Sequence, residues 1–145
     1  MTSPMKGKAI AMENIKDEAF ASGALGRGVG IVPTEGKLYA PCDAKISVVF
    51  NTKHAIGLED GNGAEILIHI GINTVNLGGK YFDVKIKEGD TVKKGQLIAT
   101  FDFEKIKSEG YSLETPLLIT NADECGTIVT HIGVVDTDTT VIEIV

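Results

Sequence analysis

Residues 52–75 read TKHAIGLEDGNGAEILIHIGINTV, and this stretch decides the fold that the rest of the chain is expected to adopt. In GAEILIHIGI, isoleucines alternate with Leu67 and His69, which is the two-residue period of a strand with one buried face. The preceding KHAIGL is also apolar, and DGNG between the two runs supplies residues that accept a positive φ in a hairpin turn. The stretch therefore predicts a β-hairpin with His54 and His69 on neighbouring strands.

These two histidines are the leading candidate site. A single histidine on an apolar strand is usually a hydrogen-bonded core residue. Two of the three histidines of the chain in one hairpin, with Thr52 two residues before His54, favour a function instead. A neutral imidazole that donates one N–H to a backbone carbonyl keeps a lone pair on its other nitrogen. That lone pair can attack phosphorus while the neighbouring ring donates to the phosphoryl oxygens.

The residues around the pair resemble the active-site segment of a known family. TKHAIGL, the DGNG turn and GAEILIHIGINTV are similar to the glucose-family enzyme IIA domains of the bacterial phosphoenolpyruvate-dependent sugar phosphotransferase system, and most to those of beta-glucoside and sucrose transporters. The similarity continues through LGRGVGIVPTEGKLYAPCDAKI, GKYFDVKIKEGDTVKKGQLIATFD and TPLLITN, so it covers nearly the whole chain. The resemblance implies an enzyme component, a phosphotransferase with a phosphohistidine intermediate that serves sugar uptake.

The resemblance also implies roles for single residues. The family histidine that matches His69 takes a phosphoryl group from phospho-HPr and passes it to a cysteine of a IIB domain. His54 is expected to hydrogen-bond the phosphoryl group, and Thr52 to orient the His54 ring. The surface that docks HPr and the IIB domain is expected to include Arg27, Val29, Ile31, Phe50, Leu67, Asn73 and Val75. Arg27 and Asn73 stand where glucose-specific domains place aspartates, so the electrostatics of docking are expected to differ.

Short strand-like runs fill the chain from Lys37 onward, separated by turn residues. This spacing predicts an all-β fold, an antiparallel sandwich or barrel, and the resemblance adds that it is of the duplicated hybrid-motif type. Only ENIKDEAFASGALG and FEKIKSEG have helical character, and both predict no more than short turns. The opening residues 3–12 predict a short edge strand. Residues 1–145 are expected to form a single domain.

Composition narrows the classes of partner. The formal net charge of −6 argues against nucleic acid and anionic lipid, because binding to either depends on basic residues that meet phosphates. There is no apolar run long enough for a membrane span and no signal-peptide pattern. The protein is therefore expected in the cytoplasm, reaching the membrane only through a IIC component. Cys42 and Cys125 are expected to be free, packed side chains.

Two other functions are compatible with the pattern. A regulatory module would use His69 as a phosphorylation-dependent signal without serving a IIB domain. A zinc hydrolase of related hybrid fold needs at least three ligands, and no second histidine stands two residues from His69. No cofactor is expected, apart from a zinc ion that His54 and His69 share with a carboxylate of a partner. Both a free subunit and a domain of a longer IIBCA protein fit the sequence.

Overall fold

The predicted hairpin forms, and the computed structural model describes it together with the rest of residues 1–145. Strand β5 (Ala55–Asp60) pairs antiparallel with β6 (Glu65–His69). The Asp60 carboxylate closes the turn, because it accepts hydrogen bonds from the backbone N–H groups of Asn62 and Ala64 at 2.9 and 2.8 Å. The acidic first residue of the turn thus fixes where the hairpin reverses.

The two faces of β6 meet different surroundings. Ile66 and Ile68 point into the core and are at most 2% exposed. Leu67 and His69 point to the opposite face and are half-buried, as the two-residue period predicts. Leu67 packs there against a second, small apolar cluster made of Ile15, Phe20, Ile72 and Leu118. The outer face of β6 is therefore partly covered by the N-terminal segment of the chain.

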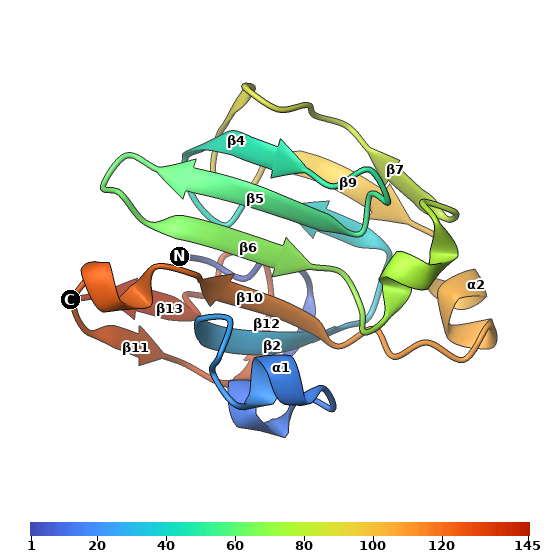
Figure 1. Cartoon of the computed structure of the whole chain (residues 1–145), viewed down its shortest axis with the longest axis horizontal. Helices are drawn as coiled ribbons and strands as arrows, with labels where there is room; N and C mark the ends of the chain where they lie inside the picture. The colour runs from blue at the N-terminus through green and yellow to red at the C-terminus, as the bar shows by residue number, and fades with distance from the viewer.

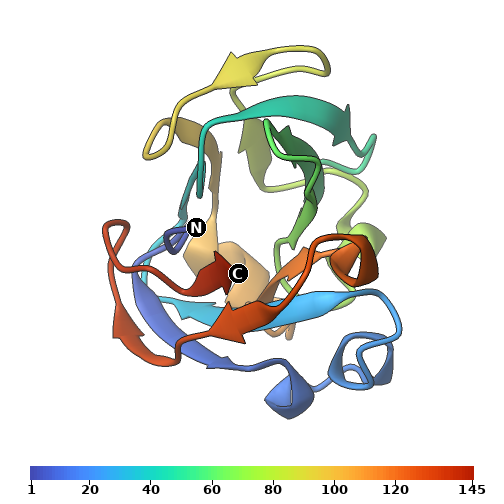
Figure 2. The ribbon, with the colours of Figure 1, turned by 90° about the vertical axis from the view of Figure 1, so that its left-hand side faces the viewer.

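The hairpin belongs to an eight-stranded antiparallel sheet in the order β12-β1-β2-β10-β6-β5-β4-β8. Its other strands are β1 (Gly7–Ala11), β2 (Arg27–Pro33), β4 (Ala44–Val49), β8 (Thr91–Val92), β10 (Thr115–Ile119) and β12 (Gly133–Val135). Figure 1 shows β4, β5, β6 and β10 side by side. Figure 2 shows how strongly the sheet curls around the interior of the molecule.

Two smaller antiparallel sheets pack against the large one. One has the order β3-β9-β7, and the other pairs β11 with β13. Their strands are β3 (Lys37–Tyr39), β7 (Phe82–Val84), β9 (Leu97–Phe101), β11 (Ile128–Thr130) and β13 (Ile142–Ile144). The main core lies between the sheets and joins Leu58 of the large sheet to Ile98 and Ile142 of the small ones. All pairings are antiparallel, so the predicted all-β sandwich is confirmed.

Helical structure is limited to short turns, as the sequence predicts. Helix α1 (Glu18–Ala21) begins after Asp17 and α2 (Phe103–Ser108) begins after Asp102, and each aspartate caps its helix with a side-chain hydrogen bond of 2.9 or 3.1 Å. The three 3₁₀ turns are η1 (Met12–Asn14), η2 (Thr74–Leu77) and η3 (Ala122–Glu124). None of the helices has the length and apolar character that crossing a membrane demands.

Strand β1 is not the edge strand that the sequence predicts. It lies between β2 and β12, because residues 133–135 return from the far end of the chain and pair outside it. The glycines of β2 allow a close approach of the neighbouring backbone. A Cβ atom at Gly28 would lie 2.0 Å from the carbonyl oxygen of Leu117 on the neighbouring strand β10.

Candidate active site

The two histidines meet at the open end of the β5–β6 hairpin, away from its turn. Their ring centroids are 4.7 Å apart and their planes are inclined by 82°. Strand pairing holds them there, since Ala55 lies opposite His69 and the Ile70 N–H donates to the carbonyl of His54 at 2.7 Å. The pair that the sequence predicts is therefore brought together by the backbone of the hairpin.

His69 keeps a lone pair on one defined nitrogen. Its Nδ1 lies 2.7 Å from the carbonyl oxygen of Gly71. A carbonyl can only accept, so Nδ1 carries the proton and Nε2 holds the lone pair. Nε2 has no hydrogen bond within the chain and is not sealed from solvent. The Phe20 ring packs edge-on against the imidazole, with centroids 5.1 Å apart. The His69 ring therefore presents an Nε2 lone pair that is not used within the chain.

His54 has the opposite hydrogen-bond arrangement. It is only 3% exposed, and its Nδ1 lies 2.7 Å from the Thr52 hydroxyl. When Thr52 donates this hydrogen bond, the ring proton of His54 is on Nε2, where it can be donated to an anion beside His69. Phe50 packs edge-on against the other side of the His54 ring, at 5.7 Å between centroids. The contact that the sequence predicts between Thr52 and His54 is present.

Burial keeps both imidazoles neutral. Burial, and secondly the charge that His69 would carry, lowers the pKa of His54 from the ordinary 6.5 to about 4. Burial also lowers the pKa of His69, and it outweighs the Gly71 carbonyl and the Asp17 carboxylate, which act in the opposite direction. At neutral pH each ring therefore offers one lone pair and one N–H, as attack on an electrophile requires.

The lowered pKa of His54 predicts a loss of stability in acid. We expect the thermal unfolding midpoint to fall as the pH drops from about 6.5 to about 4, because only the unfolded chain binds a proton at His54 in this range. In His54→Gln, part of this pH dependence should disappear. The difference between the two curves of midpoint against pH isolates the contribution of His54 from that of the carboxyl groups, which the two proteins share. Parallel curves for the two proteins would contradict the lowered pKa.

An exposed apolar rim borders the pair, but it differs from the predicted docking surface. Phe50 and Val75 are 41% and 47% exposed, and Leu67 is half-buried. The prediction that Val29 and Ile31 belong to this surface is wrong. Both are 0% exposed, because β2 turns these side chains into the main core. Their alternation with glycines left the direction of the two faces undecided in the sequence.

The charged residues of this face lie at different distances from the pair. Arg27 pairs with Ile119, which is level with Ile66 on β6, so Arg27 lies two strands across from β6 and roughly 10 Å along the strand direction from the level of His69. Arg27 is exposed, and its part in the docking surface stays a prediction. Asp17 is instead the charged residue that acts on His69. Asp17 thus provides an acidic group that acts on the pair, whereas Arg27 and Asn73 carry none.

Helix α1 contributes a contact to the site that the sequence analysis missed. The Phe20 ring contacts His69. The sequence shows only a weak helix with an aspartate at its start, and nothing in it places that helix over β6. Asn73 lies two residues beyond Gly71 in a left-handed conformation, with a φ of 60°.

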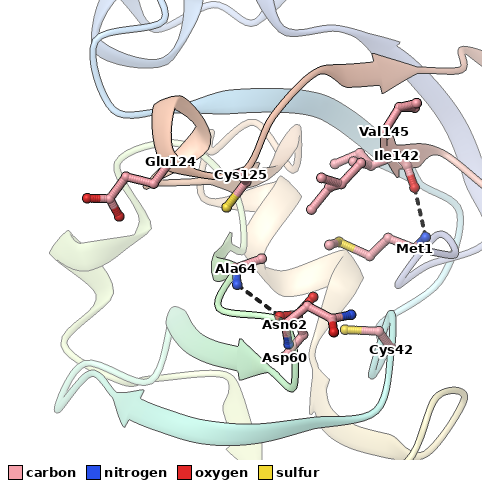
Figure 3. A pocket seen from close by; sticks show the side chains of 10 residues that line it. Met1, Cys42, Asp60, Asn62, Ala64, Glu124, Cys125, Ile142 and Val145 are labelled. Atoms are coloured by element: carbon pink, nitrogen blue, oxygen red, sulfur yellow. Dashed lines mark hydrogen bonds between the residues drawn. The ribbon is translucent and has the colours of Figure 1, made fainter.

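A separate cavity of about 490 Å³ lies at the opposite end of the hairpin, where both ends of the chain meet. Figure 3 shows Cys42 and Cys125 on opposite sides of it. Both cysteines are free, as predicted. Burial raises the pKa of Cys42 to about 11 and raises that of Cys125 as well, so neither is a thiolate nucleophile at neutral pH. No cluster of three or more His, Cys, Asp or Glu side chains is placed to hold a metal ion.

Residues 1–125 match the family described as phosphoenolpyruvate-dependent sugar phosphotransferase system, EIIA 1. The chain belongs to this family. A glucose-specific EIIA component from Borreliella burgdorferi is 42% identical to this EIIA chain over 138 residues, which are 95% of the chain and 73% of the relative. The solved structure of glucose permease IIA from Mycoplasma capricolum matches with a TM-score of 0.90 and 30% identity, over 97% of this chain and 92% of that one.

Other relatives contain this EIIA unit within longer proteins. A beta-glucoside-specific EIIBCA component from Dickeya chrysanthemi is 47% identical over 122 residues, which are 84% of this chain and 19% of the relative. The chain spans about a fifth of the length of such relatives. Membership in the EIIA family makes the chain a phosphocarrier component of a sugar phosphotransferase system. The resemblance and the class of function predicted from the sequence are thus confirmed.

Proposed function

We propose that His69 accepts a phosphoryl group on Nε2 from phospho-HPr in the cytoplasm and passes it to the cysteine of a IIB domain. The observation that carries this proposal is the hydrogen bond from His69 Nδ1 to the Gly71 carbonyl, at 2.7 Å. It leaves the Nε2 lone pair free beside a second neutral imidazole, that of His54, whose ring centroid is 4.7 Å away. The two rings then have different roles.

In the first step, His69 Nε2 attacks phosphorus. The Nε2–P bond forms, the bond from phosphorus to its donor atom in HPr breaks, and that atom keeps the electron pair. The His69 ring becomes positive, because the Nδ1 proton stays in place and continues to be donated to the Gly71 carbonyl. That fixed dipole stabilises the charge as it develops. His54, aligned by Thr52, donates its Nε2 proton to a phosphoryl oxygen as a hydrogen bond.

In the second step, the thiolate of a IIB cysteine attacks the same phosphorus. The S–P bond forms, the Nε2–P bond breaks, and its electron pair returns to His69, which becomes neutral again with its proton still on Nδ1. Neither step needs a proton to leave the site. The chain supplies only orientation and charge stabilisation, which is what phosphoryl transfer asks of a protein.

Partners of this kind fit the surface around the pair. Phe50 and Val75 form an apolar rim beside a polar centre, the arrangement that a transient protein interface requires. The names of the EIIBCA relatives place B and C components in the same protein as an EIIA unit. A zinc ion shared by His54, His69 and a carboxylate of a partner is a further proposal, since two imidazoles alone are too few ligands for a stable site.

The test is a reconstitution with purified components. We expect phosphoenolpyruvate, enzyme I and HPr together to add one phosphate to the chain that survives alkali, and omission of HPr to prevent it. The phosphorylated chain, once purified, should then donate to the IIB domain of a cognate transporter in a panel that includes beta-glucoside-, glucose- and glucosamine-specific ones. The fastest acceptor identifies the class of sugar. A chain that takes up no phosphate in the complete mixture would refute the proposal.

A further inference from the structure

The carbonyl that accepts the Nδ1 proton of His69 belongs to a loop. The loop of residues 70–74 follows β6 and contains Gly71, whose carbonyl accepts from His69 Nδ1. Two of its residues have left-handed backbone conformations, with φ of +77° at Gly71 and 60° at Asn73. Glycine adopts this conformation freely and asparagine more readily than most residues, so the sequence permits the bend and hydrogen bonds fix where it lies.

The loop is fastened at three points. Backbone groups supply two of them, because Ile70 donates its N–H to the His54 carbonyl at 2.7 Å and Ile72 donates to the Ser112 carbonyl at 3.0 Å. The third is a side chain: the Thr74 hydroxyl reaches back across the loop and donates to the Ile70 carbonyl at 2.5 Å. This hydrogen bond joins the first residue of the loop to the last.

The Thr74 side chain also packs directly against Gly71. It is 0% exposed, and a Cβ atom at Gly71 would lie only 2.6 Å from the Thr74 methyl group. The methyl group thus packs closely against the residue whose carbonyl faces His69. The Asn73 side chain makes no capping hydrogen bond at the start of η2, so it adds no second clamp.

We propose that Thr74 is a positioning residue for phosphoryl transfer: it holds the loop so that the Gly71 carbonyl keeps the His69 proton on Nδ1. The inference rests on the proposed role of His69 as phosphoryl acceptor. A hydrogen-bond acceptor next to one imidazole nitrogen determines that this nitrogen carries the proton. When the loop relaxes, the proton is shared with Nε2, and the ring then lacks a lone pair toward phosphorus.

The chain offers matched variants for the test. Thr74→Val keeps the shape of the side chain and removes the hydroxyl, whereas Thr74→Ser keeps the hydroxyl. Thr115→Val is the control, because Thr115 is also 0% exposed and its hydroxyl donates to a backbone carbonyl, that of Leu113, at 2.9 Å. We expect phosphorylation by phospho-HPr to slow about tenfold in Thr74→Val and to stay near the wild-type rate in the other two.

The decisive readout is the tautomer of His69, which a structural role alone would not change. In ¹⁵N spectra of the imidazole rings, the wild-type protein should show the proton on Nδ1, and Thr74→Val should show it shared between both nitrogens. Thr74→Ser should restore the wild-type signals. If Thr74→Val does not fold, Thr74→Ala removes the same hydroxyl and takes its place. A wild-type tautomer and rate without the hydroxyl would overturn the inference, as would an equal change in Thr115→Val.

This outcome is distinct from a failure of the proposed function. If phosphorylation survives in His69→Ala, the acceptor is a different residue and the premise is wrong. If His69 is the acceptor but loss of the Thr74 hydroxyl changes neither tautomer nor rate, only the role of Thr74 is wrong.

Discussion

The His69→Ala variant is expected to accept no phosphoryl group from phospho-HPr. In the proposed mechanism the Nε2 lone pair of His69 is the nucleophile, and His54 cannot replace it, because its Nε2 carries the proton when Thr52 donates to its Nδ1. We expect the rate of phosphorylation to fall at least about 10⁴-fold. Mass spectrometry of the intact protein under alkaline conditions, which preserve phosphohistidine, should show one added phosphate in the wild type and none in the variant.

His131→Ala is the matched control for this experiment. His131 is the third histidine of the chain, is exposed, and lies 2.9 Å from Glu143, far from the β5–β6 hairpin in the sequence. The His131→Ala variant should be phosphorylated on His69 at the wild-type rate. Peptide mapping that finds phosphate in His69→Ala, on any residue, would contradict the assignment of the nucleophile.

The His54→Gln variant is expected to separate the two transfer steps. It should still be phosphorylated, since the lone pair belongs to His69 and an amide can replace one hydrogen bond to phosphate. Onward transfer should slow by about 10²–10³-fold. In that step the phosphoryl group must be held in line while its charge redistributes, and the variant lacks the imidazole donor that holds it. The measurement is a single turnover: the variant is labelled from phospho-HPr, purified, and mixed with a cognate IIB domain.

Thr52→Val provides a graded comparison. It keeps the His54 ring and removes only the hydroxyl that lies 2.7 Å from Nδ1, so onward transfer should slow by a smaller factor in the same direction. If His54→Gln cannot be labelled while His69→Gln can, the roles of the two rings are reversed. Equal onward rates in wild type and His54→Gln would remove the donor role.

The part of the site that could be predicted from the sequence is the part that local chemistry determines. The alternation around His69 and the DGNG turn specify a hairpin, and the hairpin alone brings His54 beside His69. Thr52 stands two residues from His54, so their contact is also local. The family resemblance supplied the roles, which geometry alone does not name.

The errors concern relations between distant segments. Val29 and Ile31 alternate with glycines, and only the packed structure shows that the glycine face is the covered outer one, where Ile15 would lie 2.8 Å from a Cβ at Gly30. Asp17 precedes a helix of four residues, and its place near His69 depends on how that helix lies across the sheet. Neither relation leaves a periodic signal in the sequence.

The two ends of the chain lie next to each other at the turn end of the β5–β6 hairpin, opposite the histidine pair. The amino group of Met1 donates to the carbonyl of Ile142 at 2.7 Å, and both ends border the cavity beside Ala64. His69 is five residue steps along the strand from Ala64, a distance of roughly 16 Å. A tether attached at either end would therefore leave the histidine face free to turn from a donor to an acceptor. In relatives of the EIIBCA type, such a tether would raise the effective concentration of EIIA near its acceptor without obstructing the transfer.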